Sequence, residues 1–563
     1  MTTELIADIE TDGLIPTLTT CHCLAIANRV APTDIIVYAD QPDYPPIADG
    51  IKRLQDADIT YWHNGVGFDH PALVKLYGDD VLDRTKVRDT MILGRLFDPQ
   101  RRSHALASYG EELGFPKGDY NDWSKFTDEM ATYCARDVEV TAKVLEMVGE
   151  VMETMPDAVK IEHDFAHVIH LQQMHGFRLN VDMAVELAAE MNQLMADIEL
   201  EMQELFPPIT HERYSEKTGK RLMDKVEVFN PGSRKMIAER LIERHSWSPS
   251  KFTPTGSPQI DETILGQLPY PEAQRLSEYF LKQKQVGQIN GWLKVVTKEG
   301  YVHGSVKTIG TATFRCAHFA PNMGQISKRD LRMREVWLPD DGHKLVGIDA
   351  DALELRMLAH WLGHFDDGEY AKALLEGRKE NGTDVHSRTG KLIGLTNRDV
   401  VKRATYAYLY GASNHKLTEI MKEADSKMSG KQVRLRMNKG ITGLGRLSEV
   451  VAKAAERGWI KSLAGYRVPV RSPHSALNFL LQSSGSILMK TALNIFHFDI
   501  APPVPFSYCA NVHDEVQISC LPEDADTIGL AFANAIGLAG VKLKLNCPTS
   551  GSHDIGDNWR ETH

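Results

Sequence analysis

The hydrophobic pattern divides the chain into three regions. Residues 1 to about 145 alternate short apolar runs, such as ELIADIE and DIIVYAD, with helical stretches, which predicts an α/β domain. Residues 146–300 are largely helical and are interrupted by a polar segment at 207–225. Mixed α and β patterns return over residues 301–563. We therefore predict a multi-domain protein of the α/β and α+β classes.

One strand-like run, NVHDEVQIS at 511–519, contains three ionisable residues in a row. Alternation along a strand places Asp514 on the face of its two valine neighbours, and His513 and Glu515 on the opposite face. A buried carboxylate without a partner is costly, so an ionised Asp514 needs one, and a metal ion would serve. The alternative is a hairpin tip whose acids face water.

Composition limits the compartment and the partners. The chain contains no apolar run of membrane-spanning length and no basic and apolar leader, so we expect a cytoplasmic protein without a membrane partner. Seven scattered cysteines fit a reducing compartment. Zinc at Cys21, His22 and Cys23 is disfavoured because no second ligand pair follows at finger spacing. The net charge of −12 means that a nucleic-acid partner would need local basic surfaces, such as those at 281–285 and 377–411.

Acidic residues recur in the first region at spacings that suit a metal site. Asp8 and Glu10 are two apart on a predicted strand, so both carboxylates leave one face. Asp69 follows in HNGVGFD, and Tyr133 and Asp137 are four apart on one helical face. Four carboxylates can then converge on metal ions.

These motifs resemble the DEDD-type 3′ to 5′ exonucleases, in the version that carries tyrosine. The resemblance implies an RNase H-like domain over 1–145 in which the four acids bind two divalent ions, Mg²⁺ or Mn²⁺. It implies that Tyr133 helps to place the attacking water. The implied substrate is a phosphodiester at the 3′ end of single-stranded DNA.

The last region contains two further motifs. In KLVGIDADALELRMLAH, Asp349 ends an apolar run, which is a suitable position for a metal ligand. In RDVVKRATYAYLYGAS, Arg398, Lys402, Tyr406 and Tyr410 follow one another at spacings of four along one helical face. Two cations followed by two aromatic rings suggest contacts to a triphosphate and then a base. A surface helix whose tyrosines pack into a core is the alternative.

The order of Asp349, this helix and the HDE motif resembles family A, the DNA polymerase I-like enzymes. The resemblance implies a right-hand fold with a helical linker and thumb at 146–300, and a palm and fingers at 301–563, the fingers covering about 360–450. It implies two divalent ions on Asp349 and Asp514, with Glu515 and Lys402 also catalytic. Implied nucleotide contacts are His386, Arg398, Lys402, Tyr406 and Glu354. Implied DNA contacts are Lys284, Arg315, Asn322, Gln325, Tyr410, Gln482 and His513.

Several finer expectations follow from the resemblance. Glu354 matches the side chain that excludes a 2′-hydroxyl, so deoxynucleotides are expected. The exonuclease motif begins at Asp8, which leaves no room for a 5′ nuclease domain and points to a phage-type enzyme in the host cytoplasm. The polar segment at 207–225 takes the place of the thioredoxin-binding insertion of some phage relatives, so we expect a monomer without thioredoxin. Ala407 departs from the glycine of many relatives, which puts backbone flexibility there in doubt.

The predicted function is DNA-templated DNA synthesis with 3′ to 5′ proofreading, and the predicted partners are primer-template DNA and dNTPs. A single-subunit RNA polymerase is one alternative, but Glu354 and the exonuclease motif argue against it. A primer-template binding protein with vestigial acids is another, but both regions carry complete sets of acids.

Overall fold

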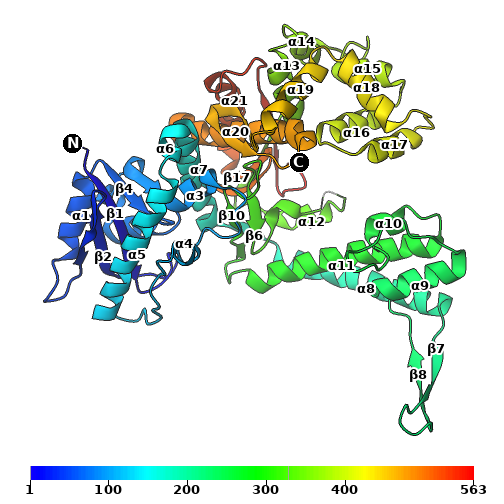
Figure 1. Ribbon diagram of the computed structural model, residues 1–563, viewed down its shortest axis with the longest axis horizontal. Helices are drawn as coiled ribbons and strands as arrows, with labels where there is room; N and C mark the ends of the chain where they lie inside the picture. The colour runs from blue at the N-terminus through cyan, green and yellow to red at the C-terminus, as the bar shows by residue number, and fades with distance from the viewer. Residues whose placement is uncertain (1, 328, 563) are drawn as a thin grey trace.

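The computed structural model describes residues 2–327 and 329–562. The N-terminal domain lies beside a central body, and a helical arm leaves that body and ends in a projecting hairpin (Figure 1). Among the described residues, no helix combines the length and the apolar character needed to cross a membrane.

The N-terminal domain is built on a five-stranded mixed sheet, in the order β3-β2-β1-β4-β5. The central strand β1 pairs antiparallel with β2 and parallel with β4. Both faces of the sheet are covered by helices, so β1 is buried at most positions instead of at alternate ones. The elements are β1 (Glu4–Thr11), β2 (Cys21–Asn28), β3 (Ala31–Tyr38), α1 (Ile47–Asp56), β4 (Ile59–Trp62), α2 (Asp69–Tyr77), β5 (Val87–Asp89), α3 (Thr90–Phe97), α4 (Leu106–Glu112) and α5 (Asp128–Val148). The predicted α/β domain is confirmed.

Helix α7 (Pro156–His175) joins this domain to the central body, after the short α6 (Val151–Thr154). It packs against α3 of the N-terminal domain. It also packs against the helix at 476–495 and the strand at 506–512 of the central body. Its buried side chains, among them Phe165 and Ile169, belong to one hydrophobic core that extends through both parts of the molecule. Burial of apolar surface therefore holds the N-terminal domain against the central body.

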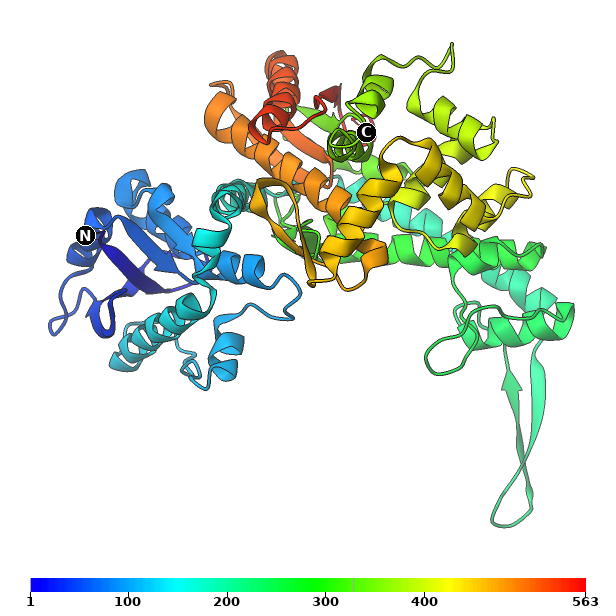
Figure 2. The ribbon, with the colours of Figure 1, turned by 45° about the horizontal axis from the view of Figure 1, so that its top comes forward.

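The helical arm lies in the region expected to form the linker and thumb. Helices α8 (Val181–Leu205) and α11 (Pro271–Val295) pack together, with α9 (Arg234–His245) and α10 (Glu262–Gly266) at the tip. The polar segment at 207–225 forms most of a two-stranded hairpin, β7 (Ile209–Tyr214) and β8 (Arg221–Glu227), which extends away from the arm (Figure 2). Its residues are exposed on both faces, so the sequence has no inside-outside alternation there.

The region expected to form the palm contains an antiparallel sheet in the order β16-β17-β13-β18. Helix α21 packs on β13 and β18, α7 packs on β16, and α20 packs against both helices. These elements are β13 (Lys344–Ala350), α20 (Ala476–Ile495), β16 (Phe506–Val512), β17 (Glu515–Cys520), α21 (Ala525–Lys542) and β18 (Gly551–Gly556). Short strands flank the palm: β6 (Phe177–Leu179), β9 (Tyr301–Val302), β10 (Ser305–Lys307), β11 (Ala317–Phe319), β12 (Trp337–Leu338), β14 (Trp459–Lys461) and β15 (Arg467–Pro469), with helix α12 (Arg332–Glu335).

The HDE motif does not lie within one strand, which corrects the sequence-based prediction. Val512 ends β16 and pairs with Glu515, which begins β17, so His513 and Asp514 form the turn between them. His513 has a φ of 61°, a left-handed conformation that is uncommon outside glycine. The predicted alternation was wrong because a two-residue turn reverses the chain, and a period of two cannot be continued across it.

The region expected to form the fingers is helical and packs against α20. It comprises α13 (Leu353–Leu362), α14 (Glu369–Glu376), α15 (Val385–Ile393), α16 (Arg398–Leu409), α17 (Asn414–Lys422), α18 (Gly430–Gly440) and α19 (Leu444–Ala455). Asn397 caps α16 by accepting hydrogen bonds from two backbone amides of its first turn. The predicted helix with its stripe of cations and tyrosines is thereby confirmed, although it ends one residue before Tyr410.

Candidate active sites

The acids of the N-terminal domain converge as their spacing predicts. Asp8 and Glu10 lie on β1, and Asp69 opens α2 and accepts a hydrogen bond from the amide of Ile9 at 3.3 Å. Asp137 lies on α5, one turn after Tyr133. Ligand atoms of Asp8, Glu10 and Cys134 all lie within 4.8 Å of one another. Four carboxylates from three elements thus share one buried site.

Burial and mutual repulsion favour the protonated forms of these acids. Burial, followed by the charges of neighbouring acids, raises the pKa of Asp8 well above its ordinary value. Burial raises the pKa of Glu10 to about 8, that of Asp69 to about 7 and that of Asp137 to about 6. Nearby positive charge would reverse these shifts.

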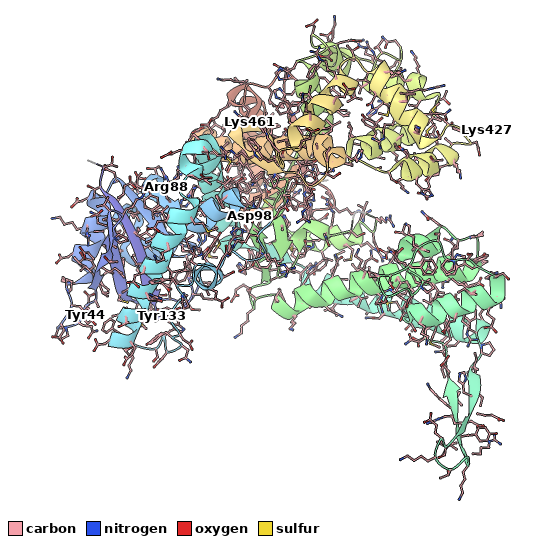
Figure 3. All side chains as sticks on the ribbon, in the orientation of Figure 1. Tyr44, Arg88, Asp98, Tyr133, Lys427 and Lys461 are labelled. Carbon is pink, nitrogen blue, oxygen red and sulfur yellow. The ribbon has the colours of Figure 1, made fainter. Side chains whose placement is uncertain are left out.

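Lys117, which the sequence analysis missed, supplies one such charge. Its ammonium lies 2.5 Å from Asp137 and 4.8 Å from the ring centroid of Tyr133, whose position Figure 3 marks. The other oxygen of Asp137 is buried and has no hydrogen-bond partner within the described part of the chain. Hard carboxylate oxygens with an unused acceptor suit a divalent cation. No spacing rule identifies Lys117, because it lies in an irregular stretch between α4 and α5.

Among the described residues, Cys21, His22 and Cys23 do not bring three ligand atoms together. Cys21 and Cys23 are buried on β2, whereas the imidazole of His22 lies 3.1 Å from the carbonyl of Trp123. They are strand and core residues, as the sequence favoured.

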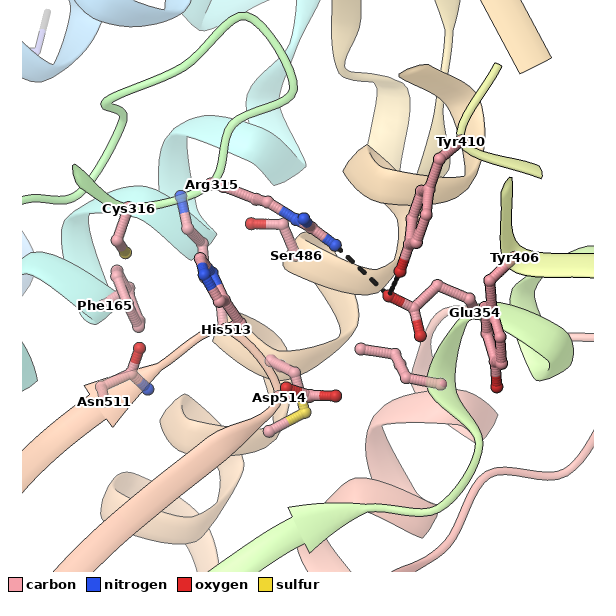
Figure 4. A pocket seen from close by; sticks show the side chains of 13 residues that line it. Phe165, Arg315, Cys316, Glu354, Tyr406, Tyr410, Ser486, Asn511, His513 and Asp514 are labelled. Atoms are coloured by element: carbon pink, nitrogen blue, oxygen red, sulfur yellow. Dashed lines mark hydrogen bonds and ion pairs between the residues drawn. The ribbon is translucent and has the colours of Figure 1, made fainter. Parts of the chain in front are cut away.

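A second site is a cavity of about 400 Å³ between palm and fingers (Figure 4). It brings together six of the predicted residues, which come from segments far apart in the chain. They are Arg315, Glu354, Tyr406, Tyr410, His513 and Asp514. The hairpin tip that carries the HDE motif therefore points into a cavity.

The two palm aspartates are held close by backbone pairing. Asp349 is the penultimate residue of β13 and stands opposite Glu515 in the sheet, and the amide of Ala350 donates to the carbonyl oxygen of Asp514 at 3.1 Å. Both side chains are partly exposed at the end of the sheet. Two carboxylates on adjacent backbone segments form a donor set that fits divalent cations.

Glu354 and the two tyrosines form one wall of the cavity. The hydroxyl of Tyr410 donates to Oε1 of Glu354 at 2.5 Å, and Nη2 of Arg315 donates to the same oxygen at 3.5 Å. The rings of Tyr406 and Tyr410 are stacked, with centroids 6.2 Å apart. Burial, and then the charges of Glu354 and Asp514, raises the pKa of Tyr406. The wall is thus aromatic and acidic, and its carboxylate is fixed in orientation.

The cationic part of the fingers helix lies one and two turns away from Tyr406. Arg398 donates to Oδ1 of Asp384 at 2.8 Å, and Lys402 is exposed. The imidazole of His386 lies 6.4 Å from the ring of Tyr406, and its pKa is lowered by burial and by the charges of Arg398 and Lys402. Arg398 and Lys402 therefore carry the positive charge of this group, and His386 lies beside them as a neutral imidazole.

Glu515 differs from its neighbour Asp514. It is 2% exposed and faces Nη1 of Arg334 at 3.4 Å, and it accepts hydrogen bonds from Gln517 at 2.9 Å and from the indole of Trp559. Arg334, Gln517 and Trp559 thus hold this carboxylate in place inside the fold. The sequence could not indicate this network, because the residues that build it are far apart in the chain.

The remaining predicted DNA contacts occupy three places. Lys284 and Gln325 line an open groove of about 760 Å³ between α11 and residues 325–327 and 329–332. Asn322 caps the short helix at 323–325. Gln482, on α20, donates to Asn478 at 2.7 Å and accepts from Thr313 at 3.4 Å, which connects it to the loop that carries Arg315. The structure does not gather these residues into one cavity.

A buried ion pair, also missed by the sequence analysis, supports that loop. Nζ of Lys490 donates to Glu162 at 2.6 and 2.9 Å and to the carbonyl of Thr308 at 2.8 Å. Tyr466 donates to the same carboxylate at 2.8 Å. The network joins α7, α20 and the start of the 308–316 loop, so it fixes the wall of the second site.

Comparisons with known proteins agree with this architecture. The family model described as DNA polymerase family A matches residues 209–561. DNA-directed DNA polymerases of Enterobacteria phage T3 and Escherichia phage T7 are each 28% identical, with 99% of this chain and 100% of theirs covered. A solved structure described as the POL domain of Pol1 from M. smegmatis, in complex with DNA primer-template and dNTP, has a TM-score of 0.78 at 17% identity. The alignment covers 100% of this chain and 96% of that one.

The palm sheet, the fingers and the acid-tipped hairpin define a nucleic-acid polymerase of the right-hand type. The chain belongs to DNA polymerase family A, and its full-length similarity is to phage members of that family.

Proposed function

We propose that this protein is a DNA-templated DNA polymerase with a 3′ to 5′ proofreading exonuclease, and that it replicates a phage genome. The observation that carries the proposal is the presence of two separate carboxylate sites in one chain of this family. One lies in the N-terminal domain and the other at the palm hairpin. Its proposed partners are primer-template DNA, dNTPs and the single-stranded 3′ end of a primer, and it acts as a monomer without thioredoxin.

In the polymerase site, the cations Arg398 and Lys402, with the imidazole of His386 beside them, bind the triphosphate of the incoming nucleotide. Tyr406 then packs against its sugar and base, while Tyr410 borders the templating base. Glu354 is held against the sugar by Tyr410 and Arg315, so it fills the space that a 2′-hydroxyl needs. His513, in the turn beside Asp514, approaches the primer terminus.

The duplex is positioned by contacts that carry no sequence information. Lys284 and Gln325 border the groove beneath the thumb, where they can bind the backbone. Arg315, Asn322 and Gln482 lie on or beside the segments that follow toward the cavity.

In the exonuclease site, the buried cluster receives the 3′ end of the primer. Tyr133 orients the attacking water, and Lys117 stabilises negative charge beside Asp137. Asp349 and Asp514 would hold two divalent ions, Mg²⁺ or Mn²⁺, in the polymerase site, and Asp8, Glu10, Asp69 and Asp137 would hold two in the exonuclease site. When bound, such ions would supply a lowered pKa for the attacking group and charge stabilisation for the leaving oxygen.

Primer extension with the wild type, Asp514→Ala and Asp8→Ala tests the proposal. Each protein is incubated with a labelled primer on a longer template in Mg²⁺, with dNTPs, with rNTPs or with neither. The wild type should extend with dNTPs, reject rNTPs and degrade the primer without nucleotides. Asp514→Ala should only degrade the primer, with its extension rate lowered by more than about 10³-fold. Asp8→Ala should only extend the primer, with its excision rate lowered by more than about 10³-fold. Extension by Asp514→Ala would refute the palm assignment, and equal use of rNTPs would favour an RNA polymerase.

A further inference from the structure

A cleft of about 660 Å³ lies at the junction of the N-terminal domain and the palm. One wall is formed by Met91 and Arg95 of α3 and by residues 99–105. The other is formed by Lys307, residues 309–312, Arg471 and Phe479. Figure 3 places Asp98, just before the first wall's irregular segment, between the two parts of the molecule. We call this space the junction cleft. It contains none of the residues assigned above to either active site.

The junction cleft is strongly basic, although the whole chain has a net charge of −12. Five of its lining residues are lysine or arginine, and none of the described lining residues is acidic: the five are Arg95, Arg101, Arg102, Lys307 and Arg471. Arg101 is held by Glu112, whereas Arg102, Lys307 and Arg471 are exposed. A concave surface with one sign of charge concentrates ligands of the opposite charge.

Both walls are connected to an active site. Residues 307–312 line the cleft, and Arg315 of the same loop lines the polymerase cavity, with the amide of Gly310 bonded to the carbonyl of Arg315 at 2.9 Å. On the other wall, the carbonyl of His104 lies 2.9 Å from Nε2 of His63, six residues before Asp69. The cleft is therefore bordered by the supports of both sites.

The cleft also offers an aromatic surface. Phe479 is half-buried on α20, three residues before Gln482, and Arg471 reaches across the junction to donate to Gln100 at 2.9 Å. Cations that bind phosphates, combined with a ring that stacks on bases, are the typical composition of surfaces that bind single strands. A basic cleft without such a ring would suit any small anion equally well.

We propose that the junction cleft binds the sugar-phosphate backbone of single-stranded DNA, with Arg102, Lys307 and Arg471 on the phosphates and Phe479 against a base. The proposal rests on the proposed function above. Two strands have this chemistry: the template overhang ahead of the polymerase cavity and the unpaired primer end on its way to the exonuclease site.

The first test is binding of a fluorescent single-stranded oligothymidylate without divalent ions. The variant combines Arg102→Ala, Lys307→Ala and Arg471→Ala, and the matched control combines Lys52→Ala, Lys372→Ala and Lys542→Ala, which removes three exposed charges outside the cleft. The cleft variant should bind at least about tenfold more weakly than the control. The slope of log K against log salt concentration should be shallower by about two, because three phosphate contacts contribute about 0.7 each on a single strand. Equal affinity and equal salt dependence of the two variants would overturn the proposal. Phe479→Ala should weaken binding without changing the salt dependence.

Two kinetic arms identify the strand. A template arm compares extension on overhangs of one and of many nucleotides, and a primer arm compares excision from matched and mismatched primer ends. If the cleft variant loses the wild-type preference for long overhangs, the cleft binds the template. If the cleft variant is slower only in the excision of mismatched ends, the cleft binds the primer. If neither changes relative to the control variant, the proposal is wrong. If the wild type itself neither extends nor excises, the proposed function fails first, so the two failures are distinguishable.

Discussion

The two acid sites hold their carboxylates in opposite kinds of surroundings. The N-terminal site crowds four carboxylates in a buried space, so three of them have pKa values raised to between about 6 and 8. The palm site places two aspartates at the partly exposed end of a sheet, next to a cavity that holds Arg315 and two tyrosines. Repulsion between carboxylates is therefore the main electrostatic feature of the N-terminal site, whereas the palm site opens onto a cavity.

This difference indicates how each site selects its ligand. A crowded carboxylate cluster gains most from divalent cations, because they remove the repulsion that burial amplifies. The palm site instead borders an open cavity, where we propose that a nucleotide binds and that neighbouring side chains discriminate among sugars and bases. The following predictions test this contrast.

The largest effect is expected in the HDE motif, where we propose that Asp514 acts in catalysis and that Glu515 supports the fold. Glu515→Ala leaves Arg334 buried without its carboxylate, so the free energy of unfolding should fall by about 3–5 kcal/mol. Asp514→Ala, in the turn, should change it by less than about 1 kcal/mol while abolishing extension. Thermal denaturation and primer extension measure the two quantities. A Glu515→Ala protein as stable as the wild type but inactive would make Glu515 catalytic, and Glu515→Gln, which keeps the volume, serves as the control.

The crowded acids predict a pH-dependent stability in the presence of a chelator. Their folded-state pKa values exceed the ordinary value of about 4, so the folded chain binds more protons than the unfolded chain between those values. Stability conferred by the protonated acids is therefore present at pH 4 and is lost as the pH rises through 6 to 8. The melting temperature should fall by more than about 3 °C over this range, relative to the Glu10→Gln, Asp69→Asn variant.

Manganese should reverse that loss in the wild type at pH 8 but not in the double variant. A melting curve that is insensitive to pH in both proteins would contradict the assigned repulsion.

Sugar selection should depend on the size of one side chain. Glu354→Ala removes the carboxylate held by Tyr410 and Arg315, so incorporation of ribonucleotides relative to deoxynucleotides should rise by at least about tenfold. Glu354→Gln keeps the volume and should retain most of the selection. Single-nucleotide incorporation assays measure the ratio, and unchanged selection in the alanine variant would remove Glu354 from this role.

The smallest effect concerns Lys117, whose ammonium lowers the pKa of Asp137. In Lys117→Met that pKa should rise, so Asp137 ionises at higher pH and the excision profile should move toward alkaline pH by up to about one unit. Extension rates should not move, and Lys117→Arg should keep the wild-type profile. A lower rate with an unshifted profile would mean that Lys117 acts on the substrate alone.

Sequence periodicity predicted correctly which side chains lie together within one strand or one helix. A spacing of two on a strand brought Asp8 and Glu10 together, and a spacing of four on a helix did the same for Tyr133 and Asp137. It failed at Asp514, because a turn interrupts the period without any glycine or proline to mark it. The β7–β8 hairpin escaped prediction because both of its faces are exposed.

Long-range partners were beyond the sequence for a different reason. Arg334 and Trp559 meet Glu515 across the fold, and Glu162 meets Lys490 between two domains. Such pairs supply hydrogen-bond partners to polar groups that the fold buries, so no local sequence pattern predicts them. Lys117 likewise acquires its role only when α5 brings Asp137 to it.

The central claim, two independent sites in one chain, is tested most directly by complementation on a primer with a mismatched 3′ end. The substrate is incubated with dNTPs and with Asp8→Ala, Asp514→Ala or an equal mixture of both. Asp514→Ala should only shorten the primer, and Asp8→Ala should extend it poorly without removing the mismatch. The mixture should yield corrected, full-length product. A mixture that yields no more corrected product than either variant alone would contradict the claim.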